Sequence, residues 1–320
     1  MMARLEDWIC RAGKAERLAL IAHVSPDGDT VGATLALRLA FLSQGKAVDV
    51  ICDDPAPKSL DFLAGHGAFI TPEQAGNAYD AAISVDVSDH RLLGRAAGVF
   101  DSAPVKLVID HHATNSGYGD CDYIRGDECA CCVLAYEAIA AMGARITPEI
   151  GACLMTGMST DTGHFMYPYT TPLAFEIAGR LCAAGVDVSY ITRRLYRTTP
   201  MARMRLMRRA YQNMHFELSD RVGVIALTKK DFEETGADLQ QTVGLVNEAL
   251  EVEGVRMAIL ATEREAGVKL SLRAVEPDTV NDVAKVFGGG GHAQAAGCTI
   301  AASMDEAIAM VLAEMAKKLG

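Results

Sequence analysis

The apolar residues in the first half of the chain gather in four short runs, at residues 18–24, 47–54, 79–87 and 104–110. Runs of this length, bounded by turn-forming residues, predict buried strands. Between the first two runs, residues 30–46 have a helical pattern that stops at Gly45. The order strand, helix, strand predicts a right-handed crossover between parallel strands. We therefore expect an open parallel sheet packed against helices.

Several of these strands end in acidic or imidazole side chains. In open parallel sheets, ligands bind outside the carboxyl ends of the strands, so such residues are expected to meet in one crevice. A tight group of nitrogen and oxygen donors suits a divalent cation of the manganese or magnesium type. Each residue alone has an ordinary alternative, such as a turn, a helix cap or a buried core histidine. The candidates are His23, Asp27 and Asp29 after the first strand, Asp86 at the end of the third, and Asp110, His111 and His112 at the end of the fourth.

A fourth contribution to this crevice is expected from residues 147–167. Pro148 predicts the first turn of a helix whose small and apolar residues indicate burial. Asp161 then lies at the end of a buried helix, where a carboxylate is costly unless it is paired or bound to a metal. The alternative is that Asp161 only caps the helix. His164 is interpreted as a residue without a direct role or as one that lines the pocket, rather than as a metal ligand.

The second half of the chain predicts a separate domain. Residues 191–219 are rich in arginine and are interpreted as a helical connector between domain 1–190 and domain 220–320. Residues 239–254 predict an amphipathic helix, and alternating residues 267–276 predict a strand that carries Arg273.

Four consecutive glycines followed by His292 are the most unusual feature of this second domain. Glycine lets successive N–H groups point at an anion, and the small residues after His292 predict a helix whose positive end adds to the effect. A flexible linker is the alternative. The pattern favours binding of a phosphate or nucleotide.

Composition limits the classes of partner. The 320 residues fit two domains, and 30 basic against 41 acidic side chains give a net charge of -11. This negative net charge argues against a uniformly positive surface that binds long nucleic acid duplexes. The sequence contains neither a signal-peptide pattern nor an apolar run of roughly 18 residues. We expect a cytoplasmic protein without membrane attachment.

The nine cysteines include no pair of C-x-x-C units, and those at 129–132 run into an apolar helical pattern. We interpret the cysteines as buried, reduced thiols without chemistry of their own.

Four segments, HVSPDGD, VDVSD, IDHH and STDTG, resemble the motifs of the DHH phosphoesterase superfamily in order and spacing. The segment GGGGH, with an arginine on a preceding strand, resembles the DHHA1 domain. The resemblance implies an α/β protein: an N-terminal DHH domain with a parallel sheet and helices on both faces, a helical connector, and a smaller α/β DHHA1 domain.

The resemblance also implies a site with two divalent metal ions, usually Mn²⁺, with Mg²⁺ or Co²⁺ as other options. In it, His23 and Asp27 bind one ion, Asp29, His111 and Asp161 bind the other, and Asp86 bridges them. His112 faces the substrate phosphate, and Asp110 orients the histidines. The implied substrate-binding residues of the DHHA1 domain are Arg273, Gly289, Gly290, Gly291 and His292. Two cations about 3.5 to 4 Å apart would activate a water molecule and offset charge on the phosphoryl group.

The overall pattern is most similar to the oligoribonuclease and pAp phosphatase branch, called nanoRNases. This resemblance implies hydrolysis of very short RNAs to mononucleotides and of pAp to AMP. The alternatives are a phosphodiesterase for cyclic or linear dinucleotides, a RecJ-like single-strand exonuclease, and a nucleotide-binding regulator without turnover. The oligomeric state is open, with a homodimer as one option.

Overall fold

The computed structural model describes residues 5–76 and 78–320. The chain forms two compact units, Met1–Thr198 and Thr199–Gly320. The division falls between α7 (Val188–Tyr196) and α8 (Met201–Asn213), within the arginine-rich stretch. Helix α8 packs against the sheet of the second unit through Leu206 and Ala210.

The first unit is built on a six-stranded sheet in the order β3-β2-β1-β4-β5-β6, in which every neighbouring pair is parallel. The four predicted strands are β1 (Arg17–Ile21), β2 (Ala47–Ile51), β4 (Ala81–Val85) and β5 (Lys106–Asp110). The edge strands β3 (Phe69–Ile70) and β6 (Cys121–Ile124) were not predicted, because they are too short to carry a periodic pattern. The expected parallel sheet is confirmed.

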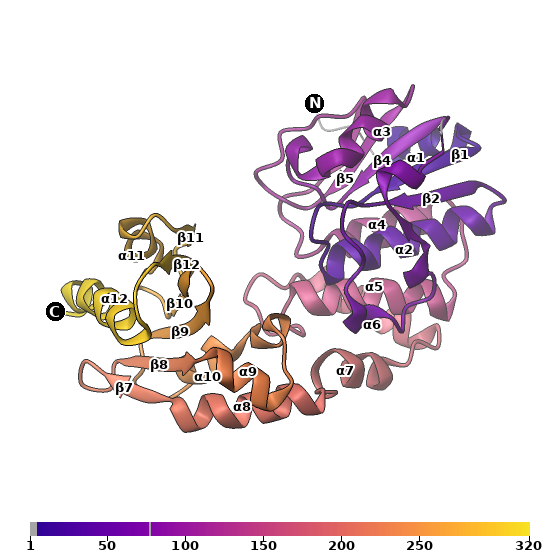
Figure 1. Cartoon of the computed structure of the whole chain (residues 1–320). Coiled ribbons are helices and arrows are strands. Elements are labelled where there is room, and N and C mark those ends of the chain that lie inside the picture. The colour runs from indigo at the N-terminus through magenta and orange to yellow at the C-terminus, as the bar shows by residue number, and fades with distance from the viewer. Residues whose placement is uncertain (1–4, 77) are drawn as a thin grey trace. The chain divides into compact units, whose positions relative to one another are not determined.

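Helices cover both faces of this sheet (Figure 1). One face packs against α1 (Leu5–Lys14), α2 (Gly28–Ser43), α4 (Cys131–Ala141) and α5 (Pro148–Asp161), and the fully buried Trp8 belongs to this layer. The other face packs against η4 (His90–Ala96) and α3 (Ala97–Ser102). Helix α6 (Pro172–Ala183) adds buried residues to the first layer. The carboxyl ends of the strands, which carry the candidate site residues, are therefore fixed by a closely packed core with helices on both faces of the sheet.

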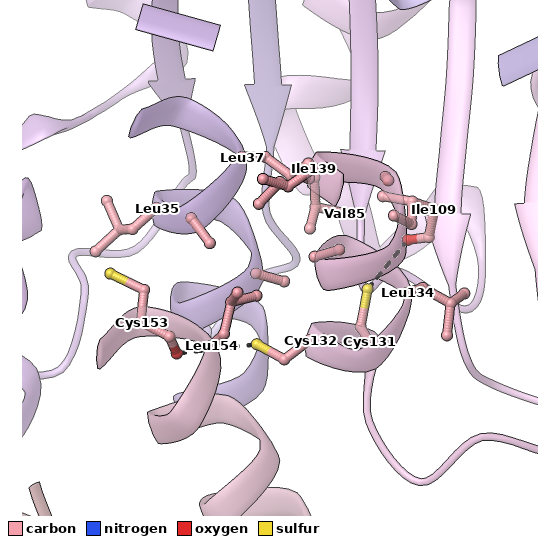
Figure 2. Packing of buried hydrophobic residues seen from close by; sticks show 14 of the residues in the cluster. Leu35, Leu37, Val85, Ile109, Cys131, Cys132, Leu134, Ile139, Cys153 and Leu154 are labelled. Carbon is pink, nitrogen blue, oxygen red and sulfur yellow. Dashed lines mark hydrogen bonds between the residues drawn. The ribbon is translucent and has the colours of Figure 1, made fainter. Parts of the chain in front are cut away.

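Helices α2 and α5 approach so closely that glycine is required between them. A Cβ atom on Gly32 would lie 2.5 Å from the carbonyl oxygen of Cys153. Figure 2 shows the surrounding packing, in which the thiol of Cys132 donates to that same carbonyl at 3.9 Å and Cys131 donates to the carbonyl of Ile109 at 3.5 Å. All nine cysteines are free, and seven are buried as predicted. The prediction of burial is wrong for Cys10 and Cys182, which are exposed.

The second unit contains a mixed six-stranded sheet in the order β11-β12-β10-β9-β8-β7. Its strands are β7 (His215–Glu217), β8 (Val222–Leu227), β9 (Met257–Arg264), β10 (Gly267–Ala274), β11 (Gly290–His292) and β12 (Ala295–Ile300). One face packs against α11 (Asn281–Val286) and α12 (Met304–Leu319), the other against α8 and α10 (Leu245–Leu250), and α9 (Lys229–Thr235) follows β8.

Two predictions for this unit are wrong in detail. Residues 239–254 do not form one helix, because Gly244 has a φ of 82° and separates η5 (Leu239–Thr242) from α10. The small residues after His292 form β12 rather than a helix. Every second residue, namely Ala296, Cys298 and Ile300, is buried in the core, which is the period of a strand. The high alanine content had suggested a helix.

Among residues 5–76 and 78–320, no helix combines the length and the apolar character needed to cross a membrane.

Replacing Gly32 with alanine tests the close approach of α2 and α5. We expect Gly32→Ala to lower the free energy of unfolding by about 1–3 kcal/mol, because the added methyl group forces the two helices apart. Gly179→Ala is the matched control, since nothing lies within 4 Å of a Cβ on this helical glycine. That variant should gain roughly 0.5–1 kcal/mol from helix propensity. Thermal unfolding of both proteins measures the difference, and equal stabilities would contradict the packing argument.

Candidate functional site

The loop after β1 turns directly into α2 and brings three candidate residues to the carboxyl edge of the sheet. Asp27 is the N-cap of α2, and its carboxylate accepts the backbone N–H groups of Asp29 and Thr30, both at 3.0 Å. A helix cap was expected, if anywhere in this loop, at Asp29, but the structure places it at Asp27, whose Oδ1 accepts both N–H groups while Oδ2 can bind another partner. His23 lies two residues beyond the end of β1. Helix capping by Asp27 and a role as a cation ligand are therefore compatible.

The remaining candidates reach the same edge from β4, β5 and α5. Asp86 directly follows β4 with a φ of 61°, a left-handed conformation that is uncommon for a residue with a side chain. His111 follows β5, and Asp161 is the last residue of α5. Potential ligand atoms lie within 4.8 Å of one another in each of three overlapping groups. These groups are His23, Asp27 and Asp86; Asp29, His111 and Asp161; and Asp86, His111 and His112.

Two histidines are oriented by backbone carbonyl groups. The Nδ1 atom of His111 lies 3.1 Å from the carbonyl oxygen of Glu128, and that of His23 lies 2.7 Å from the carbonyl oxygen of Val24. A carbonyl accepts only from an N–H, so in the neutral imidazole the lone pair is on Nε2. The Nε2 atom of His111 lies 3.2 Å from Asp161 Oδ2 and 3.5 Å from Asp86 Oδ1. The Nε2 atom of His111 thus faces carboxylates, whereas Nε2 of His23 lies 2.5 Å from the hydroxyl oxygen of Thr30.

The carboxylates of the site repel one another. Asp29 and Asp86 are almost completely buried. Burial, followed by the charges of Asp29 and Asp27, raises the pKa of Asp86 well above its usual range. Burial and the same two charges raise the pKa of Asp161 to about 8. Within the described part of the chain, no lysine or arginine forms an ion pair with any of the four carboxylates.

The site therefore has the properties of a cation site. Asp86 Oδ1 is buried and, among the described residues, has no hydrogen-bond partner. A buried, unpartnered carboxylate oxygen among like charges is costly, and divalent cations would supply the missing charge. The donor set of four carboxylates and two imidazoles fits two such ions. Metal binding by these residues stays a prediction.

Thr30 was missed by the sequence analysis although it lies at the centre of the first group. Its hydroxyl oxygen lies 2.7 Å from Asp86 Oδ2, 2.5 Å from His23 Nε2 and 3.1 Å from Asp27 Oδ1, all within hydrogen-bonding distance. The available signal was its position three residues after Asp27, which places both side chains on one face of the first helical turn.

Asp29 also has a structural partner that the sequence did not indicate. Its two oxygens accept the backbone N–H groups of Cys131 at 2.5 Å and Cys132 at 3.0 Å. These groups begin α4, whose N-cap residue Ala130 provides no side-chain cap. Asp29 therefore ties α4 to the site by satisfying donors that would otherwise lack an acceptor.

Asp110 holds His112 at the wall of the site. Asp110 Oδ1 lies 2.8 Å from His112 Nδ1, and the amide of Asn115 donates to Asp110 Oδ2 at 2.7 Å. The hydrogen bond to the buried Asp110 carboxylate raises the pKa of His112. A pocket of about 300 Å³ opens here. Its lining consists of His23, Asp27, Asp86, Ser88, Leu92, His111, His112 and Asp161.

The predicted substrate-binding residues of the second unit lie on one face of its sheet. Arg273 is directly opposite Ala295, which is directly opposite His292 on the edge strand, so both side chains project from the same face. Gly291 has a φ of 140°, and a Cβ atom on Gly289 or Gly291 would collide with the backbone of β12. These two glycines are thus required for strand packing. Phosphate binding by Arg273, Gly289, Gly290, Gly291 and His292 stays a prediction.

Comparison with known proteins identifies the class to which this fold and site belong. Residues 17–158 match the DHH family, N-terminal domain, and residues 221–318 match the DHHA1 domain. The chain belongs to the DHH/DHHA1 family, as its four motifs and its glycine-histidine segment predicted.

The chain is also similar to individual proteins over most of its length. The chain is 30% identical over 306 residues to the bifunctional oligoribonuclease and PAP phosphatase NrnA of Thermus thermophilus, covering 94% of this chain and 89% of that protein. It is 24% identical to the Bacillus subtilis protein of the same name, over 91% of both chains. A solved structure of an exopolyphosphatase-related protein from Bacteroides fragilis aligns with a TM-score of 0.87 and 27% identity, covering 98% of this chain and 94% of that one.

Replacing Asp86 with asparagine tests the electrostatic strain of the site. In the presence of EDTA, we expect Asp86→Asn to be more stable than the parent by roughly 1–3 kcal/mol at pH 8, because it removes a buried charge among like charges. Since the pKa of Asp86 is raised on folding, the unfolded chain loses this proton first, and parent stability falls as pH rises above about 4. The gain should therefore shrink toward pH 4.

Asp127→Asn serves as the control for this measurement, because the Asp127 side chain is 78% exposed. Thermal unfolding at several pH values gives the comparison. A variant at position 86 that is less stable than the parent at pH 8 would contradict the assigned repulsion.

Proposed function

We propose that this protein is a metal-dependent phosphoesterase that hydrolyses very short oligoribonucleotides to mononucleotides, pAp to AMP, or both. The observation that carries the proposal is the buried Asp86 Oδ1, which has no hydrogen-bond partner among the described residues. Asp86 belongs to two of the three ligand groups, and this oxygen lies 3.5 Å from Nε2 of His111, which belongs to the third. The names of the relatives from Thermus thermophilus and Bacillus subtilis supply the substrate class.

Two divalent cations, most simply Mn²⁺, would occupy the site, with Mg²⁺ or Co²⁺ as chemically related options. His23 and Asp27 would hold one ion, Asp29, His111 and Asp161 the other, and Asp86 would contact both. The grouping of ligand atoms supports this division. When bound, such a pair lowers the pKa of a water molecule and offsets negative charge on the phosphoryl oxygens.

His112 would act on the substrate rather than on the cations. Its Nδ1 atom is engaged by Asp110, and its side chain is 43% exposed, so Nε2 is free to face the pocket. The raised pKa favours the protonated ring, which can donate to a phosphoryl oxygen or to the leaving oxygen. Asp110 and Asn115 would keep the imidazole in this orientation.

The second unit would bind the far end of the substrate. The guanidinium of Arg273 is suited to a phosphate group, and His292 on the edge strand shares its face of the sheet. The exposed Gly290, where a side chain would meet nothing within 4 Å, leaves backbone surface open to a ligand.

A substrate panel tests the activity. With Mn²⁺, we expect the protein to hydrolyse pAp or a five-nucleotide RNA, and to act far more slowly on long single-stranded DNA. EDTA should abolish turnover, and Asp86→Asn should lower kcat by at least about a thousandfold, because it removes the ligand shared by both ions. Mg²⁺ and Co²⁺ are compared in parallel, and pApA, pGpG and c-di-AMP report the dinucleotide alternatives. Unchanged turnover in EDTA would refute the metal site.

Variants of the second unit test its substrate-binding role separately. Arg273→Gln and His292→Ala should raise KM about tenfold or more while kcat changes little, because they remove contacts to a part of the substrate that does not react. Lys230→Gln is the control, since this side chain is 78% exposed on helix α9, away from strands β10 and β11. The assignment fails if both variants match the parent in KM for every short substrate.

A further inference from the structure

Two exposed tyrosines follow the metal-site residue Asp161 in the chain. Tyr167 is 46% exposed and Tyr169 is 57% exposed, in the segment between α5 and α6. Their ring centroids lie 5.5 Å apart with planes tilted by 40°. Large apolar rings exposed side by side are not explained by the core of the first unit, so they indicate a binding surface.

Both rings are held in place by contacts with the end of α5. The hydroxyl of Tyr169 donates to the backbone carbonyl of Asp161 at 3.0 Å. The ring of Tyr167 covers Gly163, whose φ is 57° and where a side chain would collide with that ring. The backbone N–H of Tyr167 donates to the carbonyl of Thr162 at 3.0 Å. The pair is therefore preorganised and tied to a residue that lines the pocket.

We propose that Tyr167 and Tyr169 form a stacking platform for a nucleobase of the substrate. This inference rests on the proposed function, because it concerns the nucleoside attached to the phosphate that enters the pocket. A nucleobase is uncharged and tolerates the neighbouring acidic cluster, whereas a phosphate would be repelled there. Aromatic rings stack on every base, so the platform favours nucleotide substrates without selecting their sequence.

The test compares two substrates that differ only in their bases. One is pApA, and the other is the same phosphorylated backbone with hydrogen in place of both adenines. For Tyr167→Ala and Tyr169→Ala, we expect the preference for pApA in kcat/KM to fall roughly 5- to 100-fold. Tyr167→Phe and Tyr169→Phe should keep the preference, because they keep the ring.

Tyr190→Ala is the matched control, since Tyr190 on α7 is 39% exposed in the same unit but packs against the ring of Phe62. This variant should keep the parent preference. An unchanged preference in the double variant of Tyr167 and Tyr169 would overturn the platform. An equal loss on both substrates would also overturn it, because such a loss means that the tyrosines only position Asp161.

A binding measurement separates the platform from the proposed activity. With Mg²⁺ present, the 5'-monophosphate of 2-aminopurine riboside should lose fluorescence on binding to the parent, because its base stacks on the rings. The double alanine variant should lose this quenching, and equal quenching in both proteins would overturn the platform. If the parent hydrolyses neither pAp nor a five-nucleotide RNA, the proposed function fails, while the quenching result still decides the platform.

Discussion

The structure of the first unit depends on holding four carboxylates together although, among the described residues, no lysine or arginine forms an ion pair with them. Each ionised carboxylate raises the free energy of its neighbours, and burial strengthens the repulsion because water no longer screens it. A marginally stable protein cannot keep such a cluster unless the surrounding packing is rigid. The doubly covered parallel sheet and the tight contact of α2 with α5 provide this rigidity.

The individual contacts show how the repulsion is contained. Asp27 accepts two N–H groups at the start of α2, and Asp29 accepts two at the start of α4. Both carboxylates therefore lie at the positive end of a helix, which offsets part of their charge. Within residues 5–76 and 78–320, the Asp86 carboxylate has one hydrogen-bond partner, the hydroxyl of Thr30, and its Oδ1 atom has none. The remaining free energy cost is concentrated on the residue that a pair of cations would share.

The sequence predicted the parts of this arrangement that follow from the ends of strands. Because parallel strands have a common direction, His23, Asp86 and His111 had to reach one edge once the strands were recognised. Thr30 and the carbonyl of Glu128 could not be identified in this way, since their roles depend on distances across the fold. The strand at 295–300 was mistaken in part for a helix, because pairing with β10 outweighs the helix propensity of alanine. The glycines beside it were interpreted only as ligand contacts, whereas close strand packing already requires Gly289 and Gly291.

Charge also explains why a protein of this kind would favour short substrates. A phosphate that enters a pocket lined by carboxylates is attracted only when cations are bound, so metal occupancy would precede substrate binding. The net charge of the chain is -11, and every phosphate beyond the reach of the cations or of a local basic residue such as Arg273 adds repulsion. Long strands gain affinity by neutralising many phosphates with lysine and arginine, which an acidic surface does not offer. A nucleotide with one phosphate at bound cations and its base on a neutral aromatic surface would avoid this penalty, which would grow with each nucleotide added to the strand.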